Sequence, residues 1–222
     1  MLKRNANWLR GICATLIGIA LASPTLAAPN VVNGDFETGI DAFTVWPGYT
    51  GGGNPEQIEG WIGEGGRGIN PISTGEAPFR DNGGNDTHVA LLQGSAYIEQ
   101  TVGGFTVGSD YTLSLDFNAR NCCGDMPIGM ITLNGIDAGS TVDLFPPPGG
   151  IIPVGDTNDW YHADIDFTAP TADIVLRITT APATGGDSTM LVDNVSFRAV
   201  PEPGSATLML LGLLGFAARS RR

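Results

Sequence analysis

An alternation of apolar and polar residues is the feature that most constrains the fold of this 222-residue chain. From Tyr111 to Ala119 every second side chain is apolar, and the residues between them are Thr, Ser, Asp and Asn. Successive side chains of a β-strand point to opposite faces of a sheet, so this pattern is typical of a strand with one buried face. The alternation recurs at Tyr161–Phe167 and Ile174–Ile178, whereas the segment between the two chain ends shows no convincing helical period.

Shorter strands are expected between clusters of Gly, Asn, Asp and Pro, at Val31–Glu37, His88–Leu92, Ala96–Val102, Ile128–Leu133 and Met190–Arg198. The Gly-rich interval from residue 47 to 85 contains only hints of strand, around 57–62, and is expected to be mostly loop. Many short strands without helices favour an all-β fold, an antiparallel β-sandwich of the jelly-roll type. We predict one such domain over residues 28–199, flanked by two helical targeting segments.

The N-terminal segment, residues 1–27, has the layout of a secretory signal peptide. Three basic residues, Lys3, Arg4 and Arg10, precede an apolar run over 11–22, and a small-residue site ends at Ala27. We place the cut after Ala27, because a cut one residue later would leave proline directly after the scissile bond.

The C-terminal tail, residues 200–222, has three parts. Pro201, Glu202 and Pro203 form a rigid corner, an apolar run follows over 206–218, and Arg219, Arg221 and Arg222 form a basic end. As a helix the run would be about 20 Å long, short of the roughly 30 Å hydrocarbon core, so it is a marginal anchor. A plain C-terminal membrane helix is the alternative.

This tail resembles the PEP-CTERM sorting signal of Gram-negative bacteria. The resemblance implies recognition by an exosortase, a short transmembrane helix that holds the protein in the inner membrane before processing, and delivery to the cell surface or medium. Such signals often occur in bacteria that make exopolysaccharide.

The charge of the predicted body, residues 28–199, limits its partners. Five arginines against 22 acidic residues leave it with a net charge of −17, and it contains no lysine. Such a surface repels phosphate backbones, so nucleic acid is excluded as a partner. Chemistry that uses a lysine nucleophile is excluded as well. Cations and neutral polymers are compatible with this charge.

Several short motifs of the body resemble the galactose-binding type of jelly roll, a group that includes many carbohydrate-binding modules: Asn33–Glu37, Ile98–Val102, Tyr111–Leu115, the segment from Trp160 to Phe167–Ala169, and Leu191–Val195. The resemblance spans most of residues 30–199 and implies the fold more directly than the ligand.

Asp193 is anomalous, because its strand alternation places it on the same side as Leu191 and Val195. A buried carboxylate requires a cation or hydrogen bonds. In the jelly-roll group, an acid of the first strand and an acid of the last commonly share Ca²⁺; the matching positions are Glu37 and Asp193, with Asp35 as a possible third ligand. This resemblance implies structural calcium. The alternative is an aspartate that hydrogen-bonds to backbone or pairs with an arginine.

Sugar binding requires flat aromatic faces with amides and carboxylates nearby. Trp46, Tyr49 and Tyr97 are the candidates for a carbohydrate platform, and ordinary packing is the alternative for each. His162 lies between acidic residues on an outward strand face, which we interpret as a solvated surface.

Cys122 and Cys123 are the only cysteines of the body and would be exported to an oxidising compartment. A vicinal disulfide, a pair of intermolecular bridges and free thiols are the three interpretations. Zinc is disfavoured, because a structural site needs four N or S ligands.

The sequence lacks a nucleophile elbow, a metalloprotease helix motif and a Walker loop, so we expect no enzyme. The predicted function is that of an exported, non-catalytic surface protein that binds polysaccharide. The alternative is a self-assembling structural component of the extracellular matrix or surface layer.

Overall fold

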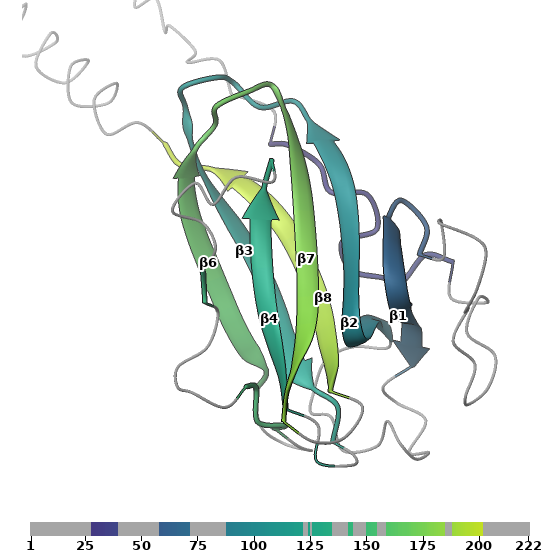
Figure 1. Ribbon diagram of the computed structural model, residues 1–222. Coiled ribbons are helices and arrows are strands. Elements are labelled where there is room, and N and C mark those ends of the chain that lie inside the picture. The colour runs from purple at the N-terminus through teal and green to yellow at the C-terminus, as the bar shows by residue number, and fades with distance from the viewer. Residues whose placement is uncertain are drawn as a thin grey trace, which may run out of the picture.

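The computed structural model describes residues 28–39, 58–71, 88–121, 124, 126–134, 142–143, 150–154, 159–184 and 188–201. These residues contain no helix and form a curled antiparallel sheet (Figure 1). The strands are β1 (Ile62–Pro71), β2 (His88–Gly103), β3 (Asp110–Ala119), β4 (Met126–Leu133), β5 (Val142–Asp143), β6 (Tyr161–Thr168), β7 (Asp173–Thr184) and β8 (Thr189–Ala199). The all-β antiparallel prediction is confirmed.

The long strand β2 joins the two layers of the fold. The strand order is β5-β4-β7-β2-β8-β3-β6, and β1 pairs with β2 outside this path. The first part of β2, Ala90–Gln93, pairs with β8, while its second part, Ala96–Gly103, pairs with β7. The strands β7 and β8 therefore diverge from β2, and β4 and β7 come to lie in front of β3 and β8 (Figure 1).

The space between the layers is filled by one apolar core, to which every strand from β1 to β8 except the two-residue β5 contributes. On β3 the inward residues from Tyr111 to Ala119 are buried, as their alternation predicts. The rings of Phe105, Tyr111, Phe167 and Phe197 pack together at one end of the core, with Phe105 edge to face at 4.9 Å from Tyr111 and 5.0 Å from Phe197 between ring centroids. Such contacts add to the free energy gained by burial alone.

Two local predictions were wrong. The segment Val31–Glu37 is a series of turns, with Asn33 and Phe36 at positive φ, and does not form a strand. Conversely, β1 lies within the Gly-rich interval, where no alternation indicates it; it pairs along β2, with an irregularity between Glu64 and Gly66.

The N-terminal turns, residues 30–38, close the fold between β2 and β8. The buried side chain of Gln100 donates to the carbonyls of Val32 and Gly60 and accepts from the N–H of Val32, at 2.8–2.9 Å. The indole N–H of Trp61 donates to the carbonyl of Asn33. The turns are thus fixed to the sheet although they form no ladder of their own.

Within the described ranges, no helix has both the length and the apolar character needed to cross a bilayer. The two predicted helical flanks, over residues 1–27 and 206–218, lie outside those ranges.

Candidate binding groove

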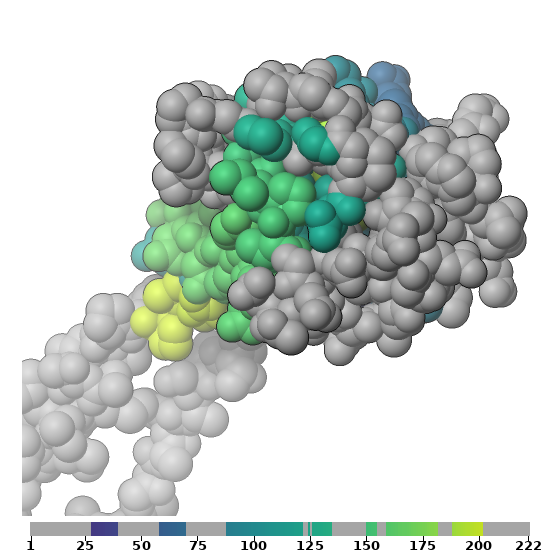
Figure 2. All heavy atoms as spheres, turned by 90° about the horizontal axis from the view of Figure 1, so that it is seen from below, coloured from purple at the N-terminus to yellow at the C-terminus, as the bar shows by residue number. Residues whose placement is uncertain are grey.

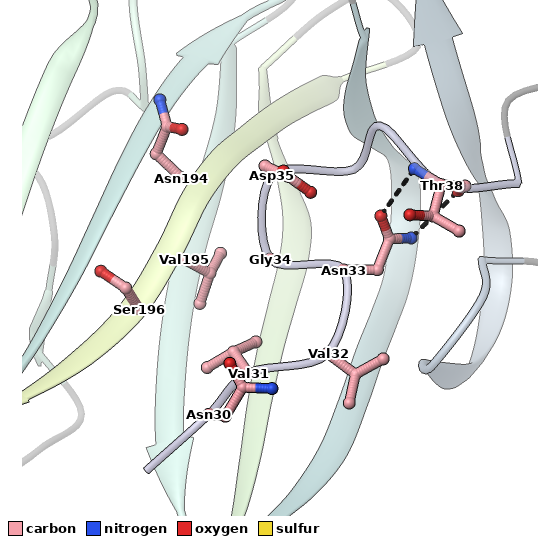
Figure 3. Close-up of a pocket in the computed structure, with 10 residues that line it drawn as sticks. All are labelled: Asn30, Val31, Val32, Asn33, Gly34, Asp35, Thr38, Asn194, Val195 and Ser196. Carbon is pink, nitrogen blue, oxygen red and sulfur yellow. Dashed lines mark hydrogen bonds between the residues drawn. The ribbon is translucent and has the colours of Figure 1, made fainter. Parts of the chain in front are cut away.

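A groove lies between the N-terminal turns and the outer side of β8 (Figure 3). It is shallow and open to solvent, with a volume of about 560 Å³, and is lined by Asn30, Val31, Val32, Asn33, Gly34, Asp35, Thr38, Asn194, Val195 and Ser196. The N–H of Val195 donates to the carbonyl of Gly34 at 2.8 Å, which holds the two walls together. A Cβ atom on Gly34 would collide with the carbonyl oxygen of Val195, so glycine is required for this close approach.

The wall formed by residues 30–38 is rigid because its own side chains tie it down. Asn33, at φ 50°, accepts from the N–H of Thr38 and donates to the carbonyls of Thr38 and Glu59. Phe36 is fully buried, and its ring lies 5.7 Å from that of Trp61. Asparagine tolerates a left-handed conformation when its side chain bonds locally, which explains its position here.

The lining chemistry is polar and nearly uncharged. Amide side chains come from Asn30, Asn33 and Asn194, hydroxyls come from Thr38 and Ser196, and Asp35 is the one ionisable group in the lining. The Asn33 amide is already bonded to Thr38 and Glu59, and that of Asn194 donates to Asp116. The exposed amide of Asn30 and the exposed hydroxyls of Thr38 and Ser196 can both donate and accept hydrogen bonds, which matches the dual character of a sugar hydroxyl. The groove therefore has the chemistry and the size of a site for a small polar ligand.

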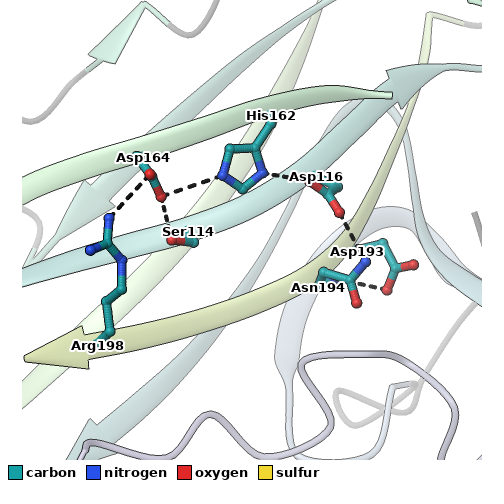
Figure 4. A network of polar contacts seen from close by, with 7 residues as sticks. All are labelled: Ser114, Asp116, His162, Asp164, Asp193, Asn194 and Arg198. Atoms are coloured by element: carbon teal, nitrogen blue, oxygen red, sulfur yellow. Dashed lines mark hydrogen bonds and ion pairs between the residues drawn. The ribbon is translucent and has the colours of Figure 1, made fainter. Parts of the chain in front are cut away.

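A polar network extends from the groove across the outer face of β3, β6 and β8 (Figure 4). The amide of Asn194 donates to Asp116 at 2.9 Å, and Nδ1 of His162 lies 2.6 Å from the same carboxylate. Nε2 of His162 is 3.4 Å from Asp164, which also pairs with Arg198 at 3.1 Å and accepts a hydrogen bond from Ser114. Three strands are cross-linked in this way.

The network changes the acidity of two of its members. The hydrogen bond to Asp116 raises the pKa of His162 above its ordinary value of 6.5, against a smaller opposing effect of burial. The hydrogen bond from Ser114 lowers the pKa of Asp164 below its ordinary 3.8, with help from Arg198 and His162. His162 points outward, as predicted, with 56% of its side chain exposed.

The residues predicted to bind calcium occupy different environments. Asp193 is 98% buried and accepts from the N–H of Asn194 at 2.7 Å. The predicted alternation is interrupted before Val195: Met190 and Val192 join the main core with Val195 and Phe197, whereas Leu191 packs in a separate cluster and Asp193 lies opposite Asp116 of β3. Both oxygens of Glu37 are engaged by His88, one by its N–H and one by Nδ1, each at 2.8 Å. Asp35 is exposed in the groove.

An ion bound at Glu37 would compete with His88 for that carboxylate. Within the described ranges no three His, Cys, Asp or Glu side chains form one cluster, so any calcium site here would also need backbone or amide oxygens as ligands. Calcium binding stays a prediction. It would appear as an increase in melting temperature with calcium that is lost in D193N.

The other predicted site residues are only partly within the described structure. Tyr97 lies on β2, away from the groove lining, and the guanidinium of Arg177 covers its ring at 4.1 Å from the centroid. Arg177 also pairs with Glu99. Trp46, Tyr49, Cys122 and Cys123 lie outside the described residues, as do all members of the sorting signal except Pro201. Their predicted roles in sugar binding and disulfide formation stay predictions.

The groove was not predicted from the sequence, although two signals pointed towards it. Asn33 and Gly34 form the dipeptide most typical of a tight turn. Asn194 and Ser196 alternate outward on the last strand, where the apolar residues between them face the core. The sequence does not reveal that these two segments meet.

The tail matches the family model described as the PEP-CTERM protein-sorting motif, over residues 199–222. This span includes all six residues predicted for the sorting signal, so the recognition of that signal is confirmed. The motif indicates export and transient membrane anchoring before sorting to the surface. A search of curated proteins returned no match.

Several solved structures share the fold. An apo cyclase from Fischerella sp. is 16% identical with a TM-score of 0.53, covering 79% of this chain and 97% of its own. The Stig cyclase Fisc from Fischerella sp. TAU, in complex with (3Z)-3-(1-methyl-2-pyrrolidinylidene)-3H-indole, is 17% identical with a TM-score of 0.51, covering 78% and 98%. A family 35 carbohydrate binding module from Clostridium thermocellum is 18% identical with a TM-score of 0.39, covering 65% and 95%. At these identities the likeness to the two cyclases shows the fold alone, and the more distant likeness to the carbohydrate binding module carries no further conclusion.

Proposed function

We propose that this chain is an exported, non-catalytic protein whose β-sandwich binds a polysaccharide through the groove of Figure 3. The observation that carries the proposal is the lining itself, where the exposed amide of Asn30 and the exposed hydroxyls of Thr38 and Ser196 border a groove of about 560 Å³. Because the walls are fixed by Gln100, Asn33 and the Gly34–Val195 contact, little ordering is needed on binding.

The electrostatics of the site favour a neutral polysaccharide. Asp35 contributes a negative charge to the groove, no cation is among its described lining residues, and the predicted mature body carries −17. A uronic acid or sulfated sugar would be repelled by this negative field, whereas a neutral sugar would lose no binding free energy to it. An amino sugar would also be tolerated, since its cation would complement Asp35.

The sorting motif supports the same role, because it concerns where the protein is delivered. A protein that is held at the membrane and then sorted to the surface is delivered to the place where extracellular polysaccharide accumulates. Exopolysaccharide is therefore the partner that we propose, together with the exosortase that processes the tail.

The test is a glycan array probed with the full chain in mild detergent, carrying neutral, amino and uronic-acid polysaccharides. We expect saturable binding to a neutral or amino glycan, and none to uronic acids. Sedimentation velocity in the same buffer measures self-assembly, which is the alternative role as a structural matrix component. Absence of binding across the array, combined with assembly that grows with protein concentration, would favour a structural matrix component instead.

A further inference from the structure

Both ends of the described body lie at one end of the sandwich. A Cβ atom on Gly104 would lie 4.0 Å from Cα of Pro29, and the N–H of Val200 donates to the carbonyl of Asp110 at 2.9 Å. Loop 104–109 is tied to loop 169–172 by the hydrogen bond from the N–H of Phe105 to Ala172. We call residues 103–109, 169–172 and 200–201 the proximal end.

The sorting motif begins directly at this end, without a linker. The matched span starts at residue 199, which is the last residue of β8, and Val200 is still hydrogen-bonded to the body. Six residues, 200–205, separate β8 from the apolar run and reach at most about 20 Å when extended.

The body is longer than the tether. Strand β7 runs from the proximal end, where Asp173 pairs with Gly103, to the distal end, where Thr184 pairs with Met126. At about 3.3 Å per residue its 12 residues span nearly 40 Å. While the tail is held in the membrane, the proximal end therefore cannot move far from the bilayer surface, whereas the distal end can lie well away from it.

The composition of the proximal end suits a position against lipid headgroups. Within residues 103–109, 169–172 and 200–201 no side chain is charged, and Val107 and Val200 are exposed by 61% and 37%; the exposed Asp110 and Asp173 border these residues. The outer face of β3 and β6 carries three further carboxylates, Asp116, Asp164 and Asp166, next to His162 and Arg198. Anionic headgroups would repel that outer face, so an upright body is favoured over one that lies on its side.

We infer that, before sorting, the proximal end faces the phospholipid headgroups of the inner membrane, and that the distal end projects away from the bilayer. Figure 2 views the molecule from this distal end, where residues of the green part of the chain reach the surface. The inference rests on the position of the sorting motif and is independent of the proposed glycan binding.

Two exposed aliphatic residues provide a matched test. Val107 lies at the proximal end and Ile152 at the distal end, where the N–H of Ile151 binds Pro127 near the start of β4, and both side chains are 61% exposed. Because residues 28–222 contain no lysine, V107K and I152K each introduce one side-chain amine. Each variant would be exported as the full chain in a Gram-negative host without an exosortase, and spheroplasts would be treated with a membrane-impermeant amine reagent.

We expect the amine of V107K to react at least about fivefold more slowly than that of I152K in membranes. In a chain that stops at Pro201, the two rates should become equal. The parent chain, treated in the same way, gives the background reaction of the N-terminal amine. If V107K does not fold, A172K provides a second position at the proximal end. Equal rates in the membrane-held chain, or protection of I152K instead, would overturn the orientation without bearing on the groove.

Discussion

At the scale of single residues, His162 shows how cross-strand partners give an exposed side chain a defined state. It lies opposite Asp116 in the pairing of β3 with β6, and its ring also approaches Asp164. Alternation placed His162 on the outer face correctly. The partner on β3 was missed, because the sequence gives no indication of which strands pair or in which register.

We predict that His162 titrates above 6.5 in the folded protein, because its hydrogen bond to Asp116 favours the protonated ring. The pairing stabilises the fold fully below 6.5, and that contribution is lost as pH rises through the folded-state pKa. A proton NMR titration of the imidazole resonances measures the pKa directly. The protein has only two histidines, so H88N identifies the signal.

In D116N the pKa of His162 should fall towards 6.5, while S114A should affect it less, since Ser114 bonds to Asp164. An unshifted His162 in the parent protein would contradict the network of Figure 4.

At the scale of elements, the N-terminal turns are the part of the fold that pattern analysis could not supply. Residues 31–37 contain Val31, Val32 and Phe36, which resemble a short strand in composition. Positive φ at Asn33 and Phe36 prevents pairing, and side-chain hydrogen bonds replace the ladder. The strands β3, β6 and β7 were predictable because apolar and polar residues alternate along each of them. The first half of β8, from Thr189 to Asp193, is buried on both faces, which no alternation indicates.

We predict that F36A lowers the free energy of unfolding by about 3–5 kcal/mol, since it removes a fully buried ring that packs on Trp61. Chemical denaturation monitored by tryptophan fluorescence is the measurement. V32A alters a neighbouring side chain that is 49% exposed, and should cost less than about 1 kcal/mol. Similar small losses in both variants would show that the turns are not part of the cooperative unit.

At the scale of the whole molecule, the chain consists of a delivery signal and a body whose chemistry is separate from it. The tail was recognisable because its order of Pro-Glu-Pro, apolar run and arginines is specific, and the family match covers it. The fold was predictable from alternation. The groove was not, because it forms where residues 30–38 meet β8, more than 150 positions later in the chain.

The central claim is that the groove between the N-terminal turns and β8 binds the polysaccharide. It is tested most directly by the affinity of the full chain for the glycan selected on the array, measured by isothermal titration calorimetry. In the double variant N30A/S196A, which removes two exposed polar side chains of the lining, we expect affinity to fall at least about tenfold, or about 1.4 kcal/mol. T101A, an exposed hydroxyl on β2 outside the lining, should bind like the parent. Unchanged affinity in N30A/S196A, with its melting temperature preserved, would contradict the claim.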